Sequence, residues 1–193
     1  MVTNQVNISP GNIKTGRIPA CSVRPVADCP NSCKDCYALK AWKQYPSVRA
    51  AWSENSRIAH EDLPKFKEQV INWIEKKRKT PRFFRIHVAG DFFSQDYLNG
   101  WKSISAQCDE TRFLAFTKAY QLDYSDLPEN MRIVFSMWPQ LPDTAPKYFP
   151  RAYMQDGTEK RIPNYALECP GNCESCGMCW NLELGQAVVF EKH

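Results

Sequence analysis

The segment Phe83-Phe84-Arg85-Ile86-His87-Val88-Ala89-Gly90-Asp91 predicts a β-strand that stops at a glycine–aspartate pair. Aromatic and β-branched residues favour strands, and glycine next to aspartate favours a turn. Ser94 then suits a helix N-cap, and the apolar residues after it recur at helical spacing: Tyr97, Leu98, Trp101 and Ile104. A strand that leads directly into a helix is half of a βαβ unit, so this segment indicates a parallel sheet.

The rest of the chain repeats this alternation of strands and helices. A helix is expected after Asp62, a suitable N-cap, and Pro64, because the apolar residues that follow share one helical face: Phe66, Val70, Trp73 and Ile74. Another helix is expected to start near Cys36 and to continue through Trp42. Further strands are expected over 21–26, 112–117, 132–137 and 187–191, and a tight turn at Asp156-Gly157.

The composition suits one folded domain with a small appended module. The chain has 193 residues, of which 43% are hydrophobic and 24% charged. The formal net charge of +4 is mild. The densest basic run, 76–79, falls at the end of an expected helix, where it complements the helix dipole in solvent. Nucleic-acid binding is therefore not indicated.

The cysteine content is the most informative feature of the composition. The sequence has no run of 18 apolar residues and no secretory signal at residues 1–5, so we expect no membrane span and a cytoplasmic location, where thiols stay reduced. Seven of the nine cysteines fall in two short groups. Soft thiolates at short spacing bind zinc or iron–sulfur clusters, so disulfides are the weaker interpretation.

The first group, Cys29, Cys33 and Cys36, has the spacing C-x3-C-x2-C. Three thiolates on one compact loop can each bind one iron of a cubane cluster, which leaves the fourth iron open to a small molecule. Structural zinc normally takes four protein ligands and usually shows C-x2-C pairs. The spacing therefore favours an iron–sulfur cluster over zinc.

This spacing resembles the signature of the radical S-adenosylmethionine (SAM) superfamily. In that family three such cysteines, in the loop after the first strand of a full or partial β/α barrel, hold a [4Fe–4S] cluster whose open iron binds SAM. Reductive cleavage of SAM then gives a 5′-deoxyadenosyl radical that abstracts hydrogen from a substrate. The resemblance implies that Cys29, Cys33 and Cys36 are cluster ligands. The sequence is also similar to uncharacterised phage-encoded cysteine-rich proteins.

Further residues are assigned by the same resemblance. Many family members carry a glycine-rich turn that ends in an acidic residue after the second strand, where it binds the SAM amino group, and Gly90-Asp91 would take this place. The family usually has an aromatic residue immediately before the third cysteine, in contact with adenine. Here Asp35 holds that position and Tyr37 follows the cysteine. Either Tyr37 makes the adenine contact or SAM is not bound in the usual way.

The second group places four thiolates within eleven residues, with the spacing C-x3-C-x2-C-x2-C: Cys169, Cys173, Cys176 and Cys179. This spacing is nearly a bacterial ferredoxin run read backwards, and it resembles the auxiliary clusters of radical SAM proteins. Four thiolates also suit a closed zinc site, so zinc remains the alternative here. Cys108 is expected to be a buried apolar residue, and Cys21 a spare ligand at most.

Other polar residues are expected to line a cavity at the carboxyl ends of the strands. Arg85 and His87 share one strand face by the period of two, so His87 could bind substrate or move a proton, although a structural histidine is the more common case. Lys118, Ser136 and Trp138 follow or end later strands. Lys118 is, with His87, a candidate catalytic residue, and Ser136 and Trp138 are candidates to bind cofactor or substrate at the same opening.

These observations predict an α/β fold, namely a partial, TIM-like β/α barrel with a C-terminal cysteine-rich iron–sulfur extension. The expected divisions are an extended lead-in (1–20), the barrel core (21–150) and the extension (151–193). The expected function is that of a radical SAM enzyme with two [4Fe–4S] clusters, SAM, an unknown substrate and a reductant such as flavodoxin or ferredoxin. The alternatives are an iron–sulfur electron carrier or regulator without SAM chemistry and, third, a zinc-stabilised nucleic-acid-binding module.

Overall fold

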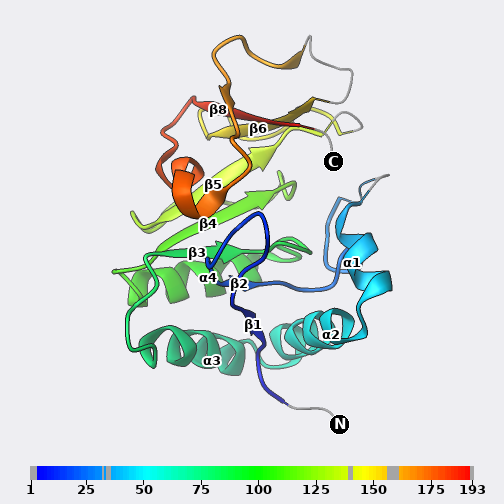
Figure 1. Cartoon of the computed structure of the whole chain (residues 1–193), viewed down its shortest axis with the longest axis vertical. Helices are drawn as coiled ribbons and strands as arrows, with labels where there is room; N and C mark the ends of the chain where they lie inside the picture. Colours follow the sequence, from blue (N-terminus) through cyan, green and yellow to red (C-terminus); the bar gives the residue numbers. More distant parts are fainter. Residues whose placement is uncertain (1–3, 32, 34–35, 139–140, 156–160, 192–193) are drawn as a thin grey trace.

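The protein is built on one open, mostly parallel β-sheet (Figure 1). The computed structural model describes residues 4–31, 33, 36–138, 141–155 and 161–191. The eight strands stand in the order β1-β2-β3-β4-β5-β6-β8-β7, and only the β1–β2 pair is antiparallel. Their bounds are β1 Ile8–Ser9, β2 Ala20–Cys21, β3 Phe83–Ile86, β4 Arg112–Thr117, β5 Met131–Ser136, β6 Arg151–Gln155, β7 Leu167–Glu168 and β8 Ala187–Glu191.

The longer helices lie in the first 107 residues. They are α1 Ala38–Gln44, α2 Pro46–Glu61, α3 Leu63–Glu75 and α4 Gln95–Gln107; the C-terminal part adds the short α5 Cys173–Cys176 and the 3-10 helix η2 Met178–Asn181. The predicted caps are confirmed, since Asp62 accepts a hydrogen bond from the Lys65 amide and Ser94 from the Tyr97 amide. No helix in the described part of the chain is long and apolar enough to cross a bilayer.

The predicted α/β class and parallel sheet are confirmed, but the sheet differs from the expected barrel in two ways. Among the described residues β1 and β7 are the two edge strands and do not pair with each other, so the sheet does not close. The described parts of the β4–β5 and β5–β6 connections also contain no helix. The sequence pattern missed α2 and three strands, β1, β6 and β7. The predicted turn at Asp156-Gly157 lies outside the described residues.

One face of the sheet packs against α3 and α4 and forms the main core. The strand residues on this face and their helical partners are fully or nearly fully buried: Phe84, Ile86, Phe113, Ile133 and Phe135 with Phe66, Val70, Ile74, Leu98, Trp101 and Ile104. Burial of a large side chain contributes about 1.5–3 kcal/mol, so this layer supplies most of the hydrophobic stabilisation. It fixes the strands whose carboxyl ends carry the candidate site.

The opposite face is covered by the second cysteine group, with its short α5 and η2, instead of by long helices. Leu114, Val134 and Val188 point to this side and pack against Trp180 and Leu182 of the C-terminal segment. The Trp180 indole donates a hydrogen bond to the Phe84 carbonyl oxygen at 3.3 Å. The sheet therefore separates a helical core on one face from a cysteine-rich layer on the other.

His87 lies in the helical core and does not share the face of Arg85, contrary to the period-two prediction. Strand β3 ends at Ile86, and His87 has a left-handed φ of 60°, which turns its ring toward α4. The ring is 2% exposed, and its Nε2 lies 3.1 Å from the Tyr97 hydroxyl. Burial, followed by the charge of Arg85, lowers the pKa of His87 to about 3.

A neutral buried histidine makes stability depend on pH. Because the pKa of His87 falls from 6.5 to about 3 on folding, the unfolded chain binds more protons between these values, and stability is lost as pH falls below 6.5. Between pH 7.5 and pH 5 we expect the wild type to lose about 2 kcal/mol more stability than the His87→Asn variant. Asparagine tolerates the positive φ and does not titrate in this range. Urea unfolding at both pH values measures this difference. Parallel pH profiles for the two proteins would contradict it.

Candidate functional site

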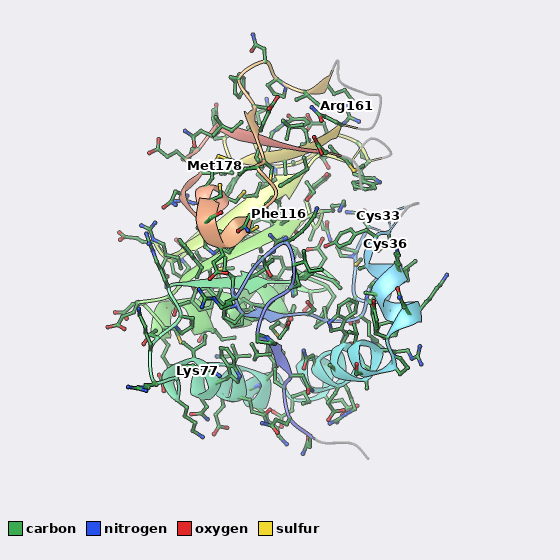
Figure 2. The ribbon with its side chains drawn as sticks, viewed as in Figure 1. Cys33, Cys36, Lys77, Phe116, Arg161 and Met178 are labelled. Atoms are coloured by element: carbon green, nitrogen blue, oxygen red, sulfur yellow. The ribbon has the colours of Figure 1, made fainter. Side chains whose placement is uncertain are left out.

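The first cysteine group lies on the loop that leaves the carboxyl end of β2 and leads into α1. Cys29, Cys33 and Cys36 are each partly buried, and Figure 2 shows Cys33 and Cys36 beside α1. The turn after β3 and the residues that follow β4 and β5 reach the same edge of the sheet. The structure therefore brings the three thiols to the edge where active sites of parallel β/α proteins lie.

A buried carboxylate anchors the start of this loop on α2. Asp28 is 1% exposed and accepts hydrogen bonds from the Arg24 amide at 2.9 Å, the Arg24 guanidinium at 3.1 Å and the Ser56 hydroxyl at 2.5 Å. His60 Nε2 lies 2.9 Å from the same carboxylate. Burial alone raises the pKa of Asp28, but these hydrogen bonds outweigh it and hold the pKa below its usual value. The position next to Cys29 is thereby fixed.

Three further contacts hold the loop against the strand ends. The Asp91 amide donates to the Asp28 carbonyl oxygen at 3.0 Å, and the Asn31 side-chain amide donates to the Lys118 carbonyl oxygen at 2.5 Å. Tyr37, whose side chain is largely exposed, donates its hydroxyl to the Val88 carbonyl oxygen. The predicted adenine contact of Tyr37 remains a prediction. Asp35, the departure from the family pattern, lies outside the described residues.

Gly90 and Asp91 have clear structural roles at this edge. Asp91 is 6% exposed and accepts hydrogen bonds from the Phe92 amide, the Thr117 hydroxyl and the Lys118 amide at 2.6–2.8 Å. Burial raises its pKa, and these hydrogen bonds oppose that shift. Gly90 has φ +80°, and a Cβ there would lie 2.3 Å from Val23 Cγ2. The pair therefore ties the β3 turn to the β2 loop and to the end of β4.

Lys118 and Trp138, which follow β4 and β5, form one wall of the site. The Lys118 ammonium lies 4.6 Å from the centroid of the Trp138 ring, and the Trp138 indole nitrogen is buried without a hydrogen-bond partner in the described structure. The Ser136 carbonyl oxygen accepts a hydrogen bond from Tyr120. A cavity of about 280 Å³ opens beside this wall, lined by Asn31, Tyr120, Gln121, Leu141, Pro142 and Thr144. Lys118 and Ser136 thus lie at the predicted opening, whereas His87 does not.

The thiols of the first group influence one another. Burial, followed by the negative charge of Asp91, raises the pKa of Cys29 to about 12, and Cys33 and Cys36 add to this shift. Burial also raises the pKa of Cys33, and the positive charge of Lys118 opposes the shift. Thiols this close to each other ionise together only with a compensating positive charge, which a bound metal centre supplies.

The second cysteine group forms backbone hydrogen bonds with both the N-terminal and the C-terminal part of the chain. The Cys169 amide donates to the Val189 carbonyl oxygen and the Cys173 amide to the Lys14 carbonyl oxygen, each at 2.9 Å. Gly177, with φ +60°, ends α5 and begins η2. Burial raises the pKa of Cys179 to about 12, with contributions from the other three thiols of the group. The four thiols are therefore near enough to influence one another's ionisation.

Arg85 lies between the two cysteine groups. Its Nε donates to the His87 carbonyl oxygen at 3.0 Å, and its guanidinium lies 4.2 Å from the centroid of the Phe116 ring, which is labelled in Figure 2. Burial lowers its pKa, while Tyr37 on the first loop and Cys173 and Cys179 of the second group oppose the shift. The Arg85 cation therefore interacts with Tyr37 of the first loop and with two thiols of the second group.

All nine cysteines are free thiols. Within the described ranges, no group of three or more histidine, cysteine, aspartate or glutamate side chains is arranged to hold a metal ion. The fit to a metal centre therefore rests on the donors themselves: two sets of soft thiolates, each on one loop, with Lys118 and Arg85 nearby to offset negative charge. Cys21 and Cys108 are buried away from both sets, in the helical core.

Comparison with known proteins places this arrangement in a family. The profile of the family described as "Gene product 88" matches residues 3–140. The chain belongs to this family. The match covers the first cysteine group, Asp91, Lys118 and Ser136, and ends before the second cysteine group. The predicted similarity to phage-encoded proteins is thereby confirmed, whereas the matched family is not radical SAM.

Two curated relatives of the Gene product 88 family extend the similarity over most of the chain. The "Gene 88 protein" of Mycobacterium phage L5 is 27% identical over an alignment of 216 positions that covers 93% of this chain and 90% of the relative. The "Gene 88 protein" of Mycobacterium phage D29 is 27% identical over an alignment of 218 positions, with the same coverage. No solved structure matches significantly. The names of these two relatives state no activity.

Sequence reasoning missed the residues that organise the site. Asp28 is 28 residues from Ser56 and 32 from His60, so only the packing of α2 against the loop brings it to these two side chains. Asp28 is directly before Cys29, and this adjacency was the only available signal. Arg85 was placed on the correct face, but its position between the cysteine groups depends on how the C-terminal segment crosses the sheet.

The close approach at Gly90 gives a test of the β2–β3 connection. We expect Gly90→Ala to destabilise the protein by about 3 kcal/mol or more, because a positive φ and a clash with Val23 act together. Val23→Ala in the same chain should restore about 1 kcal/mol or more, since it removes the clashing methyl group. Gly171→Ala is the matched control, because Gly171 has φ +83° and open space around its Cβ position. Equal losses of unfolding free energy in Gly90→Ala and Gly171→Ala would show that the contact with Val23 is unimportant.

Proposed function

We propose that this protein is an iron–sulfur protein of the radical SAM type. Cys29, Cys33 and Cys36 would hold one [4Fe–4S] cluster with an open iron. Cys169, Cys173, Cys176 and Cys179 would hold a second, closed cluster. The observation that carries the proposal is the position of the C-x3-C-x2-C loop at the carboxyl end of a strand in a parallel sheet, beside a polar wall and a cavity. The nine free thiols suit a reducing compartment such as the cytoplasm.

When bound, the first cluster would supply a low-potential electron and an open iron that binds the amino and carboxylate groups of SAM. The chain itself does the positioning. The Asp28 network fixes the loop on α2, and Asn31 and Tyr37 fasten it to the ends of β4 and β3. The Lys118 ammonium favours the Cys33 thiolate and lies over the Trp138 ring, from where it would hold an anionic group of a substrate.

The second cysteine group would serve electron transfer or structure, because four protein ligands leave its cluster no open position. Trp180 and the C-terminal strands seat this group on the sheet. Arg85 offsets the negative charge of Cys173 and Cys179. A four-thiolate zinc site is the alternative for this group alone, since four thiolates complete a tetrahedral shell.

Metal content tests the two sites separately. After anaerobic reconstitution with iron and sulfide we expect about eight irons per chain, since two cubanes hold four each. Replacing Cys29, Cys33 and Cys36 with alanine should remove about four irons, and replacing the second group should remove the other four. The matched control is Cys21→Ala with Cys108→Ala, which should keep the full content because both thiols lie in the helical core. Zinc in place of iron at the first group would refute the proposal.

A spectroscopic measurement separates a SAM enzyme from an electron carrier. SAM should change the EPR spectrum of the dithionite-reduced protein, because coordination to an open iron alters its electronic structure. The change should persist in the variant that lacks the second cysteine group and vanish in the variant that lacks the first. 5′-Deoxyadenosine should accumulate in the same sample. If SAM does not change the EPR spectrum of protein that holds both clusters, the result would instead support an electron-transfer or regulatory role.

A further inference from the structure

The segment that follows the first cysteine group carries positive charge that no carboxylate of the same segment offsets. From Cys36 to Ser53 the only charged residues are Lys40, Lys43 and Arg49, without a single carboxylate. All three cations are exposed, and none of them forms an ion pair within the described part of the chain. In a chain with a net charge of only +4, this segment is a local positive field.

The same segment exposes aromatic rings on a helix that has little packing of its own. Ala38 is the only buried residue of α1, which packs mainly against α2. Tyr37 is 64% exposed and Tyr45 is 50% exposed, and Trp42 stacks on Trp52 of α2 with the ring centroids 6.2 Å apart. Exposed tyrosine, tryptophan and arginine are the residues enriched in protein–protein contact surfaces.

This surface lies immediately outside the first cysteine group. Helix α1 begins two residues after Cys36, and Figure 2 shows Cys33 and Cys36 next to it. Tyr37 connects the two, because its ring is exposed on the surface while its hydroxyl binds the Val88 carbonyl oxygen at the end of β3. A molecule bound on α1 would therefore be adjacent to whatever the cysteines hold.

We propose that α1 and the first half of α2, the α1–α2 surface defined by Tyr37, Lys40, Lys43, Tyr45 and Arg49, dock a small acidic electron-transfer protein. The inference rests on the proposed function, since the partner would reduce the centre held by Cys29, Cys33 and Cys36. One electron passes from the reduced carrier to that centre, and the carrier is oxidised by one electron. Transient electron-transfer complexes use small, charge-complementary interfaces, which fits a surface of two short helical segments.

The alternative occupant for a basic and aromatic surface is single-stranded nucleic acid. The observations favour the acidic protein, because Trp42 and Trp52 stack on each other, which occupies one face of each ring. An electron donor bound at this position would also be close to the centre that it reduces. Binding of single-stranded DNA to this surface is therefore measured beside binding of the acidic protein.

Charge reversal on the α1–α2 surface tests the proposal with flavodoxin as the acidic donor. In the reconstituted protein, Lys40→Glu, Lys43→Glu and Arg49→Glu together should slow reduction by flavodoxin hydroquinone about tenfold or more at low salt, and raising the salt should shrink the difference. Reduction by dithionite should change by less than about threefold, because a small reductant needs no docking surface. Stopped-flow absorbance of the cluster measures both rates.

The matched control reverses three cations away from α1, at the end of α3, with Lys76→Glu, Arg78→Glu and Lys79→Glu. It changes the net charge by the same amount, and Lys77 marks this site in Figure 2 on the other side of the molecule from α1. The control should keep the wild-type rate with flavodoxin within about twofold, because only local charge steers docking. Equal slowing by both triple variants would overturn the proposal.

A binding measurement separates this proposal from the proposed function. If reconstitution yields no cluster, the proposed function fails, but titration of oxidised flavodoxin into the metal-free protein still tests docking. The α1–α2 variant should then bind at least about tenfold more weakly than the control variant. Equal affinities overturn the docking surface, as does loss of single-stranded DNA binding without loss of flavodoxin binding.

Discussion

The carboxylate of Asp28 is buried against α2, and an unpaired charge in that position would cost several kcal/mol. The side chains of Arg24, Ser56 and His60 contact this carboxylate. These contacts fix the loop, α2 and the end of β2 relative to one another. Cys29 follows directly in the chain. The placement of the first cysteine group thus depends on a polar cluster that carries none of its chemistry.

The two faces of the sheet have different functions because they are covered differently. Helices α3 and α4 bury one face and supply the core, which keeps the parallel strands in register. The other face receives the C-terminal segment, whose Trp180 and Leu182 pack on Leu114 and Val134. This crossing brings residues more than 130 positions apart in the chain to opposite sides of Arg85. A sheet that closed on itself would leave no such face for the cysteine segment.

Much of the strand and helix pattern could be predicted because each element has strong local signals. The caps at Asp62 and Ser94 and the β4 and β8 boundaries all follow from local chemistry. Strands β1 and β7 have two residues each and gain their identity only by pairing with a neighbour. His87 shows the limit of periodicity, because a single left-handed residue ends the strand and moves the ring to the opposite layer.

The amino-acid sequence by itself determined the parallel α/β class, the two thiol sets and their spacing, because periodicity and donor chemistry are local properties. Only the tertiary structure decided that the sheet stays open, that His87 lies in the core, and that Arg85 stands between the cysteine groups. It also decided that Asp28, Ser56 and His60 form one cluster. These features depend on contacts between distant segments, and burial of charge and apolar area selects such contacts only when the whole chain folds.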